Sequence, residues 1–121
     1  MKVYISGKIG ETNISEATRK KFEHAALVLR NRKHEPFNPC DEEWQEHLKI
    51  QCRFDVDPWF DFYTYVLLRD QMALATKDAI CLLPDWKESP GAKTELAFAR
   101  ATGKTILQLT EYGEIITWKT D

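Results

Sequence analysis

Glu95 is the residue whose type and place in the sequence point most directly to chemistry. It follows the segment Ser89–Pro90–Gly91, which can open a helix, by about one turn. A carboxylate there lies near the positive end of the helix dipole, which favours its ionised form. It would also face the strand ends of an open α/β sheet, where ligands bind. The simpler alternative is that Glu95 only complements the dipole on a solvated face, and Asp70 by itself would most often be a solvated helix charge as well.

Three segments are expected at the carboxyl ends of strands, where such a ligand would sit. They are the glycine-containing loop Ser6-Gly7-Lys8-Ile9-Gly10, the pair Asn38-Pro39, and the stretch from Asp85 to Glu95. The glycines of the first loop would let the backbone approach a ligand and expose amide groups, which suits a phosphate or a sugar. The loop is neither a P-loop nor a GxGxxG fingerprint. A turn that simply needs glycine explains it equally well.

The elements that must position these segments alternate along the chain. Short apolar or β-branched runs predict strands at 2–6, 34–37, 78–84 and 105–109, with 114–118 as a possible edge strand. Helical periodicity predicts a first helix with apolar positions from 17 onwards and its end at 32. Further helices are predicted over 41–53, 60–76 and 91–102. We therefore expect one domain over residues 1–121, an α/β three-layer doubly wound sandwich. Its mostly parallel sheet would have about five strands, in a flavodoxin-like or Rossmann-like arrangement.

Caps and apolar spacing orient the predicted helices. Asn13 with Glu16 fits a capping box at the start of the first helix, and Ser15 is a rival cap. Asp41 would cap the second helix, with Trp44, Leu48 and Cys52 along one face. In the third helix the inward face is expected to carry Tyr65, Leu68, Met72 and Leu74 or Ala75. The uninterrupted DAICLLP run predicts a central parallel strand covered on both faces.

Composition excludes several classes of function. The formal net charge of -2 gives no basic face for a nucleic-acid backbone. Cys40, Cys52 and Cys81 have no paired spacing, so neither a disulfide framework nor a zinc site is indicated. The acidic residues Asp55, Asp57 and Asp61 lack metal-ligand spacing, and no metal or cofactor is expected. No apolar stretch reaches the ~20 residues of a membrane span, and a cytoplasmic protein with no membrane partner is predicted.

The chain contains, in order, the segments VYISGKIG, NP and LRDQMALATKDAICLLPDWKESPGAKTELAFARATGK. Together these segments resemble a known superfamily. It is that of the nucleoside 2-deoxyribosyltransferases and the deoxynucleoside 5′-monophosphate N-glycosidases. The segment LLPDWKESPGAKTELAFA is most similar in sequence to the DUF4406-type proteins. The resemblance covers most of the chain, and residues 40–63 are the least matched. It implies an enzyme that cleaves or transfers an N-glycosidic bond without a cofactor, acting on a small nucleotide or nucleoside.

The resemblance also implies roles for single residues. Glu95 would be the nucleophile that attacks the anomeric carbon of the sugar, and Asp70 would donate a proton to the base or orient it. Tyr4 would hydrogen-bond Glu95, although plain strand packing explains it equally well. The contacts to the substrate would come from Ser6, Gly7, Lys8, Ile9, Gly10, Asn38, Trp86, Ser89 and Gly91.

Position 89 distinguishes two substrate classes within the superfamily. Transferases of free nucleosides typically carry an aspartate six residues before the glutamate, where this chain has Ser89. The monophosphate N-glycosidases resemble it in carrying serine, because a carboxylate would repel the phosphate. Lys8 could add a positive charge for that phosphate, whereas Gly10 stands where those hydrolases carry an arginine. Trp86 could stack on a base, or it could cover the sheet edge or a subunit contact.

Two readings of other classes stay open at this point. One is a non-catalytic protein that senses or sequesters a nucleotide on the same fold, and the other is a purely structural or interaction protein. The dense aromatic group Trp59, Phe60, Phe62, Tyr63 and Tyr65 is expected to pack partly in a homo-oligomer interface. In the superfamily that the chain resembles, neighbouring subunits complete each other's sites, so a dimer or larger assembly is expected.

Overall fold

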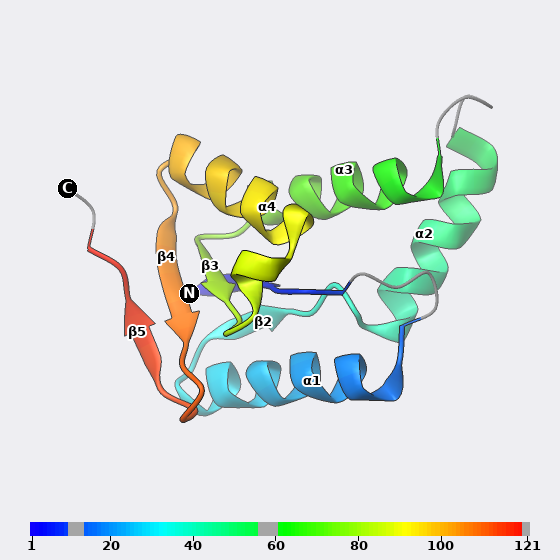
Figure 1. Cartoon of the computed structure of the whole chain (residues 1–121). Coiled ribbons are helices and arrows are strands. Elements are labelled where there is room, and N and C mark those ends of the chain that lie inside the picture. The colour runs from blue at the N-terminus through cyan, green and yellow to red at the C-terminus, as the bar shows by residue number, and fades with distance from the viewer. Residues whose placement is uncertain (10–13, 56–60, 120–121) are drawn as a thin grey trace.

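The computed structural model describes residues 1–9, 14–55 and 61–119. They form one five-stranded sheet covered by helices (Figure 1). The strands are β1 (Lys2–Ser6), β2 (Glu35–Phe37), β3 (Ala79–Leu82), β4 (Thr105–Leu109) and β5 (Ile115–Thr117). Their order in the sheet is β2-β1-β3-β4-β5, with β5 antiparallel to β4 and the other pairs parallel. The predicted α/β fold with a mostly parallel sheet is confirmed, in the flavodoxin-like order with a reversed edge strand.

Helices cover both faces of this sheet. They are α1 (Glu16–Asn31), α2 (Glu42–Asp55), α3 (Phe62–Ala75) and α4 (Pro90–Ala101), with a short 3-10 turn, η1 (Trp86–Glu88), before α4. Figure 1 shows α1 on one side of the sheet and α3 and α4 on the other, while α2 lies beyond the carboxyl end of β1. Among the described residues, no helix is both long and apolar enough to cross a membrane.

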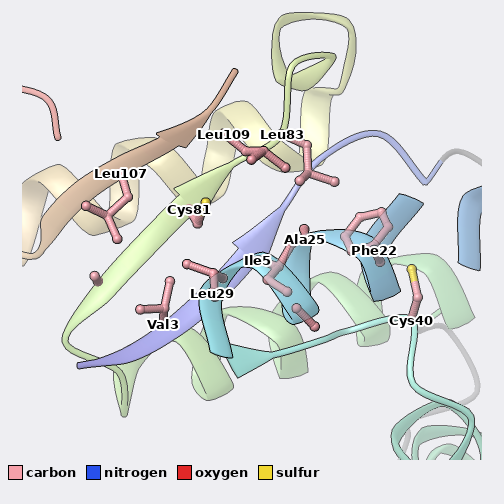
Figure 2. Packing of buried hydrophobic residues seen from close by; sticks show 12 residues of the cluster. Val3, Ile5, Phe22, Ala25, Leu29, Cys40, Cys81, Leu83, Leu107 and Leu109 are labelled. Atoms are coloured by element: carbon pink, nitrogen blue, oxygen red, sulfur yellow. The ribbon is translucent and has the colours of Figure 1, made fainter. Parts of the chain in front are cut away.

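The alternation of side chains along β1 divides the core into two layers. Val3 and Ile5 pack in the cluster that includes Phe22 and Leu29 of α1 (Figure 2). Tyr4 points to the opposite face, into the cluster formed with α3 and α4. This follows from the two-residue period of a strand. All four residues of β3 are buried, so the predicted central strand with both faces covered is confirmed.

Helix boundaries differ from the predicted ones by one or two residues. Ser15 caps α1 through a hydrogen bond from the Thr18 amide, whereas Asn13 lies outside the described residues. Helix α2 begins at Glu42 and extends two residues past its predicted end. Helix α3 begins after Asp61, whose side chain accepts the Thr64 amide. Asp61 is thus a helix cap.

The predicted inward face of α3 is partly wrong. Leu68 and Met72 are exposed, at 47% and 63%, while Tyr65, Asp70 and Leu74 are buried. The pattern misleads because α3 is apolar on most of its circumference, so hydrophobicity alone does not choose a face. Packing against α2 and α4 turns the side that carries Asp70 inward.

The strand order indicates a ligand-binding position at the carboxyl ends of β1 and β3. From β1 the chain crosses to β2 on one side, and from β3 it crosses to β4 on the other. The carboxyl ends of the neighbouring strands β1 and β3 are therefore the switch point of the sheet, where ligands of open α/β proteins bind.

Candidate active site

A cavity of about 480 Å³ opens at this switch point. Its walls come from the loop after β1, the loop between β3 and α4, and the first turns of α3 and α4. Both carboxylates singled out by the sequence, Asp70 and Glu95, are in its lining. The described residues that line it are Gly7, Lys8, Ile9, Ile14, Gln45, Phe62, Tyr63, Val66, Leu67, Asp70, Glu88, Ser89, Pro90, Gly91, Ala92 and Glu95.

Glu95 is held by two hydroxyl groups from β1. It lies in the second turn of α4 and is 6% exposed. The Tyr4 hydroxyl donates to Oε2 at 2.5 Å, and the Ser6 hydroxyl donates to Oε1 at 2.7 Å. Because each carboxylate oxygen has its own donor on a rigid central strand, the side chain has one preferred orientation. Glu95 is therefore not the solvated helix charge of the simpler alternative.

Burial sets the charge of Glu95 more strongly than the helix end does. Burial raises the pKa of Glu95 to about 7, while the hydrogen bonds from Tyr4 and Ser6 act to lower it. The helix N-terminus still favours the ionised form, but the loss of water on burial shifts the pKa of Glu95 the other way. Near neutral pH the group exchanges readily between its acid and its carboxylate.

Asp70 is the second carboxyl group of the cavity, and it too is buried, at 4% exposure. The indole Nε1 of Trp44, on α2, donates to its Oδ1 at 2.8 Å. Burial first, and then the negative charge of Glu95, raise the pKa of Asp70 to about 8. Asp70 is therefore an acid that keeps its proton at neutral pH, and the simpler alternative of a solvated helix charge does not hold.

Tyr4 connects the two carboxyl groups. Its ring is buried in the core, and its hydroxyl donates to Glu95. Burial and the negative charges of Glu95 and Asp70 raise its pKa well above the ordinary value, so the phenol stays protonated. One cavity thus contains a carboxylate that ionises first and an acid that holds its proton longer. Such a pair can divide nucleophilic and proton-donating roles between its members.

The family model described as "Domain of unknown function (DUF4406)" matches residues 1–108, a span that includes both carboxyl groups and the cavity. The chain belongs to this family. Comparison with curated proteins gives no match. Among solved structures, the DUF4406 protein is similar to a 2-deoxyribosyltransferase from Bacillus psychrosaccharolyticus, with a TM-score of 0.61 and 22% identity. That similarity covers 96% of this chain and 77% of the other, and it shows a shared fold.

The first loop of the DUF4406 protein is tied to the loop after β3. Gly7 to Ile9 line the cavity, whereas Gly10 lies outside the described residues. The Lys8 amide donates to Asp85 at 3.0 Å. Lys21 donates both to the Lys8 carbonyl, at 2.7 Å, and to Asp85, at 2.6 Å. These contacts hold two walls of the cavity at a set separation.

Gly7 has a packing role that the sequence did not indicate. A Cβ atom at this position would lie 2.7 to 3.0 Å from three side-chain atoms of Leu83, which is fully buried. We expect Gly7→Ala to lower the free energy of unfolding by about 1–3 kcal/mol, because Leu83 has no space to retreat. Thermal unfolding measures this. Gly91→Ala is the control, since its Cβ would meet Leu67 at an ordinary 3.7 Å; equal melting temperatures for the two variants would contradict the packing argument.

Ser89 combines a helix cap with a place in the cavity wall. Its hydroxyl oxygen accepts a hydrogen bond from the Ala92 amide at 3.1 Å, at the start of α4. It is buried, and Gly91 lines the cavity beside it. A hydroxyl group that accepts one hydrogen bond can still donate its proton to a ligand.

Two predicted contact residues lie elsewhere. Asn38 accepts the Cys40 amide at 2.8 Å and lines a separate, smaller hollow beside Trp44. Trp86 packs edge-on against Trp118 at 5.8 Å, over the β4-β5 side of the sheet. Neither residue is in the lining of the main cavity. Of the readings left open for Trp86, the geometry supports a cover for the sheet edge.

Several lining residues were not predicted as site residues. Phe62 and Tyr63 belong to the aromatic group of which part was expected in a subunit interface, and they line the cavity with Gln45, Val66 and Leu67. Trp44 was predicted only as part of the apolar face of its helix. Its amphipathic position was readable, but its partner Asp70 depends on how α2 crosses α3. Of the other members of the aromatic group, Tyr65 is buried in α3, and positions 59 and 60 lie outside the described residues.

Possible metal ligands do not gather in the described part of the chain. Within residues 1–9, 14–55 and 61–119, no group of three or more His, Cys, Asp or Glu side chains is arranged to hold a metal ion. The side chain of Asp55, and Asp57 entirely, lie outside the described structure. Cys40, Cys52 and Cys81 are not joined in a disulfide.

Proposed function

We propose that the DUF4406 protein cleaves or transfers the N-glycosidic bond of a nucleoside or a nucleoside 5′-monophosphate, with Glu95 as nucleophile. The observation that carries this proposal is the pair of buried carboxyl groups in one cavity, the first oriented by Tyr4 and Ser6 and the second by Trp44. The fold shared with a 2-deoxyribosyltransferase supports it.

The proposed reaction has two steps. A carboxylate oxygen of Glu95 attacks the anomeric carbon while the bond from that carbon to the base nitrogen breaks. Asp70 transfers its proton to the departing base, so that the base leaves neutral. The sugar is then held as an ester of Glu95. Water completes hydrolysis, or a second base completes transfer, by attacking the same carbon and releasing the Glu95 carboxylate. The ionised Asp70 takes up the proton that the water or the second base loses, and so regains its acid form.

The cavity wall suits the parts of such a substrate. The apolar side chains of Phe62, Val66 and Leu67 offer a surface for the flat face of a base, on the same helix as Asp70. The loop from Gly7 to Ile9 comes directly after the carboxyl end of β1 and would lie along the sugar. Base and sugar would then meet between Asp70 and Glu95, where the bond to be broken must lie.

A 5′-phosphate would lie near Ser89. This residue offers a hydroxyl at the first turn of α4, where amide groups favour an anion. Lys8, on the facing loop, supplies a positive charge at the mouth of the cavity. A carboxylate in place of Ser89 would repel the phosphate. These features support the monophosphate over the free nucleoside.

We expect Ser89→Asp to weaken use of a monophosphate by about tenfold or more, while use of the free nucleoside is retained or improved. The physical reason is charge repulsion alone, because aspartate caps a helix as well as serine does. The ratio of kcat/KM for the two substrates measures it. Ser89→Asn is the matched control, since asparagine is also a good cap and carries no charge; an equal loss in both variants would contradict phosphate binding here.

The proposed activity is tested with a panel of nucleosides, deoxynucleosides and their 5′-monophosphates. Each is incubated with the protein, free base is measured by chromatography, and thermal stabilisation is recorded in parallel. Release of base from at least one member supports the proposal. Stabilisation without release of base points to a sensor or sequestering protein. If no member of the panel stabilises the protein or releases base, nucleosides and nucleotides are excluded as its ligands.

A further inference from the structure

Trp44 is held against Asp70 by a hydrogen bond that has no part in the two proposed steps. Its indole nitrogen lies 2.8 Å from Asp70 Oδ1, joining α2 to α3 across 26 positions of sequence. Trp44 is not among the residues that line the main cavity. Trp44 instead lines the smaller hollow beside Asn38, so its indole reaches Asp70 from outside the main cavity.

The Trp44 ring is part of an aromatic stack that also contains Tyr4. Tyr4 stacks on Phe37 at 5.5 Å, and Phe37 meets Trp44 edge-on at 5.2 Å. One end of this stack donates to Glu95 through the Tyr4 hydroxyl, and the other end donates to Asp70 through the indole. The two carboxyl groups are thus held relative to each other by three packed rings from β1, β2 and α2.

We propose that Trp44 is a positioning residue that fixes Asp70 so that Oδ2, and not Oδ1, carries the transferable proton. An indole N–H can only donate, and the carbonyl oxygen of a protonated carboxyl group is a stronger acceptor than its hydroxyl oxygen, so the indole favours Oδ1 as the carbonyl oxygen. Oδ2 remains as the oxygen that can be protonated. The donor is also neutral, so it orients Asp70 without holding it ionised as a guanidinium would. This inference rests on the proposed function, in which Asp70 protonates the base.

Two other titratable groups face Asp70, from two other elements. Glu95 faces it from α4 and Tyr4 from β1. Its neighbour in sequence, Arg69, is directed elsewhere, with its guanidinium donating to the Tyr65 hydroxyl at 2.7 Å and lying 3.3 Å from the His47 ring. The same guanidinium lies over the rings of Trp44 and Tyr65, 5.9 and 5.6 Å from their centres.

Carboxyl NMR titration of ligand-free protein tests the inference without any need for turnover. We expect Trp44→Phe, which keeps the aromatic packing, to raise the pKa of Asp70 by about 1 or more, because a hydrogen bond to the charged form is lost. Trp118→Phe is the matched control. It also removes an indole hydrogen bond, to Gln108 at 2.9 Å, but Trp118 does not line the cavity, so the change should leave the pKa of Asp70 unchanged.

A second measurement uses no change at position 44. The indole N–H resonance of Trp44 should move with pH at the pKa of Asp70, and this movement should vanish in Asp70→Asn. An indole resonance that ignores the titration of Asp70, or a pKa unchanged by Trp44→Phe, overturns the inference. If both measurements succeed while no substrate releases base, the hydrogen bond stands and the proposed function fails instead. With an active protein, Trp44→Phe should lower kcat more than it alters KM.

Discussion

Glu95→Gln is expected to lower the release of free base at least a thousandfold while leaving the protein folded. The amide keeps the size of the side chain and can still hydrogen-bond with Tyr4 and Ser6. It cannot form an ester with the sugar, so the first chemical step is lost. Chromatography of free base under single-turnover conditions measures the effect, using the best substrate of the panel.

Glu88→Gln is the matched control for this result. Glu88 also lines the cavity, but it is an exposed residue of η1. We expect that variant to keep most of its activity, because its charge is not directed at the reacting carbon. Base release by Glu95→Gln at the wild-type rate would exclude Glu95 as nucleophile. Equal loss in both variants would show that cavity charge, and not a covalent step, matters.

The same Glu95→Gln variant should be more stable than the wild type at alkaline pH. An unfolded glutamate ionises near 4.5, but burial holds the folded pKa of Glu95 at about 7. Between these values the folded protein binds more protons than the unfolded one, so the wild type loses stability as pH rises. The loss is complete above pH 7, on the order of 3 kcal/mol for a pKa difference of this size. Glutamine does not titrate, so the two melting temperatures should diverge from pH 4.5 to 7.

Asp70→Asn is expected to lower kcat/KM about 10²–10⁴-fold and to change the shape of its pH dependence. In the wild type, activity should rise through pH 7 as Glu95 ionises and fall above pH 8 as Asp70 loses its proton. The result is a bell-shaped profile with its maximum between these values. Asparagine has no proton to lose, so the alkaline limb should disappear and the acid limb should remain. Initial rates of base release from pH 5 to 10 measure both limbs.

Asp78→Asn provides the control for the pH profile. Asp78 is an exposed aspartate that accepts the Lys2 amide at 2.9 Å and is not in the cavity lining. Its replacement should leave the bell unchanged. An alkaline limb that persists in Asp70→Asn would assign the proton to another group, and wild-type rates would remove Asp70 from the reaction.

The strands and helices of this protein were readable from local sequence. The apolar run inside DAICLLP is typical of a strand covered on both faces, and Ala79–Leu82 form the buried central strand β3. Gly103 marked the end of the last helix, and its backbone has the positive φ of 70° that glycine adopts easily. Such signals depend on neighbours within one turn or one strand. Where two faces of a helix are equally apolar, as in α3, the same signals placed Leu68 and Met72 on the wrong side.

The candidate site was readable only in its residue types. The sequence by itself, through its resemblance to a known superfamily, determined which side chains to examine: Glu95, Asp70, Tyr4, Ser89 and the first loop. The tertiary structure alone decided that both carboxyl groups are buried in one cavity, and that Asn38 and Trp86 are not in it. It also paired Trp44 with Asp70. The physical reason is that burial and hydrogen bonding depend on contacts between segments far apart in the chain, and those contacts set the charge of a carboxyl group more strongly than its own helix does.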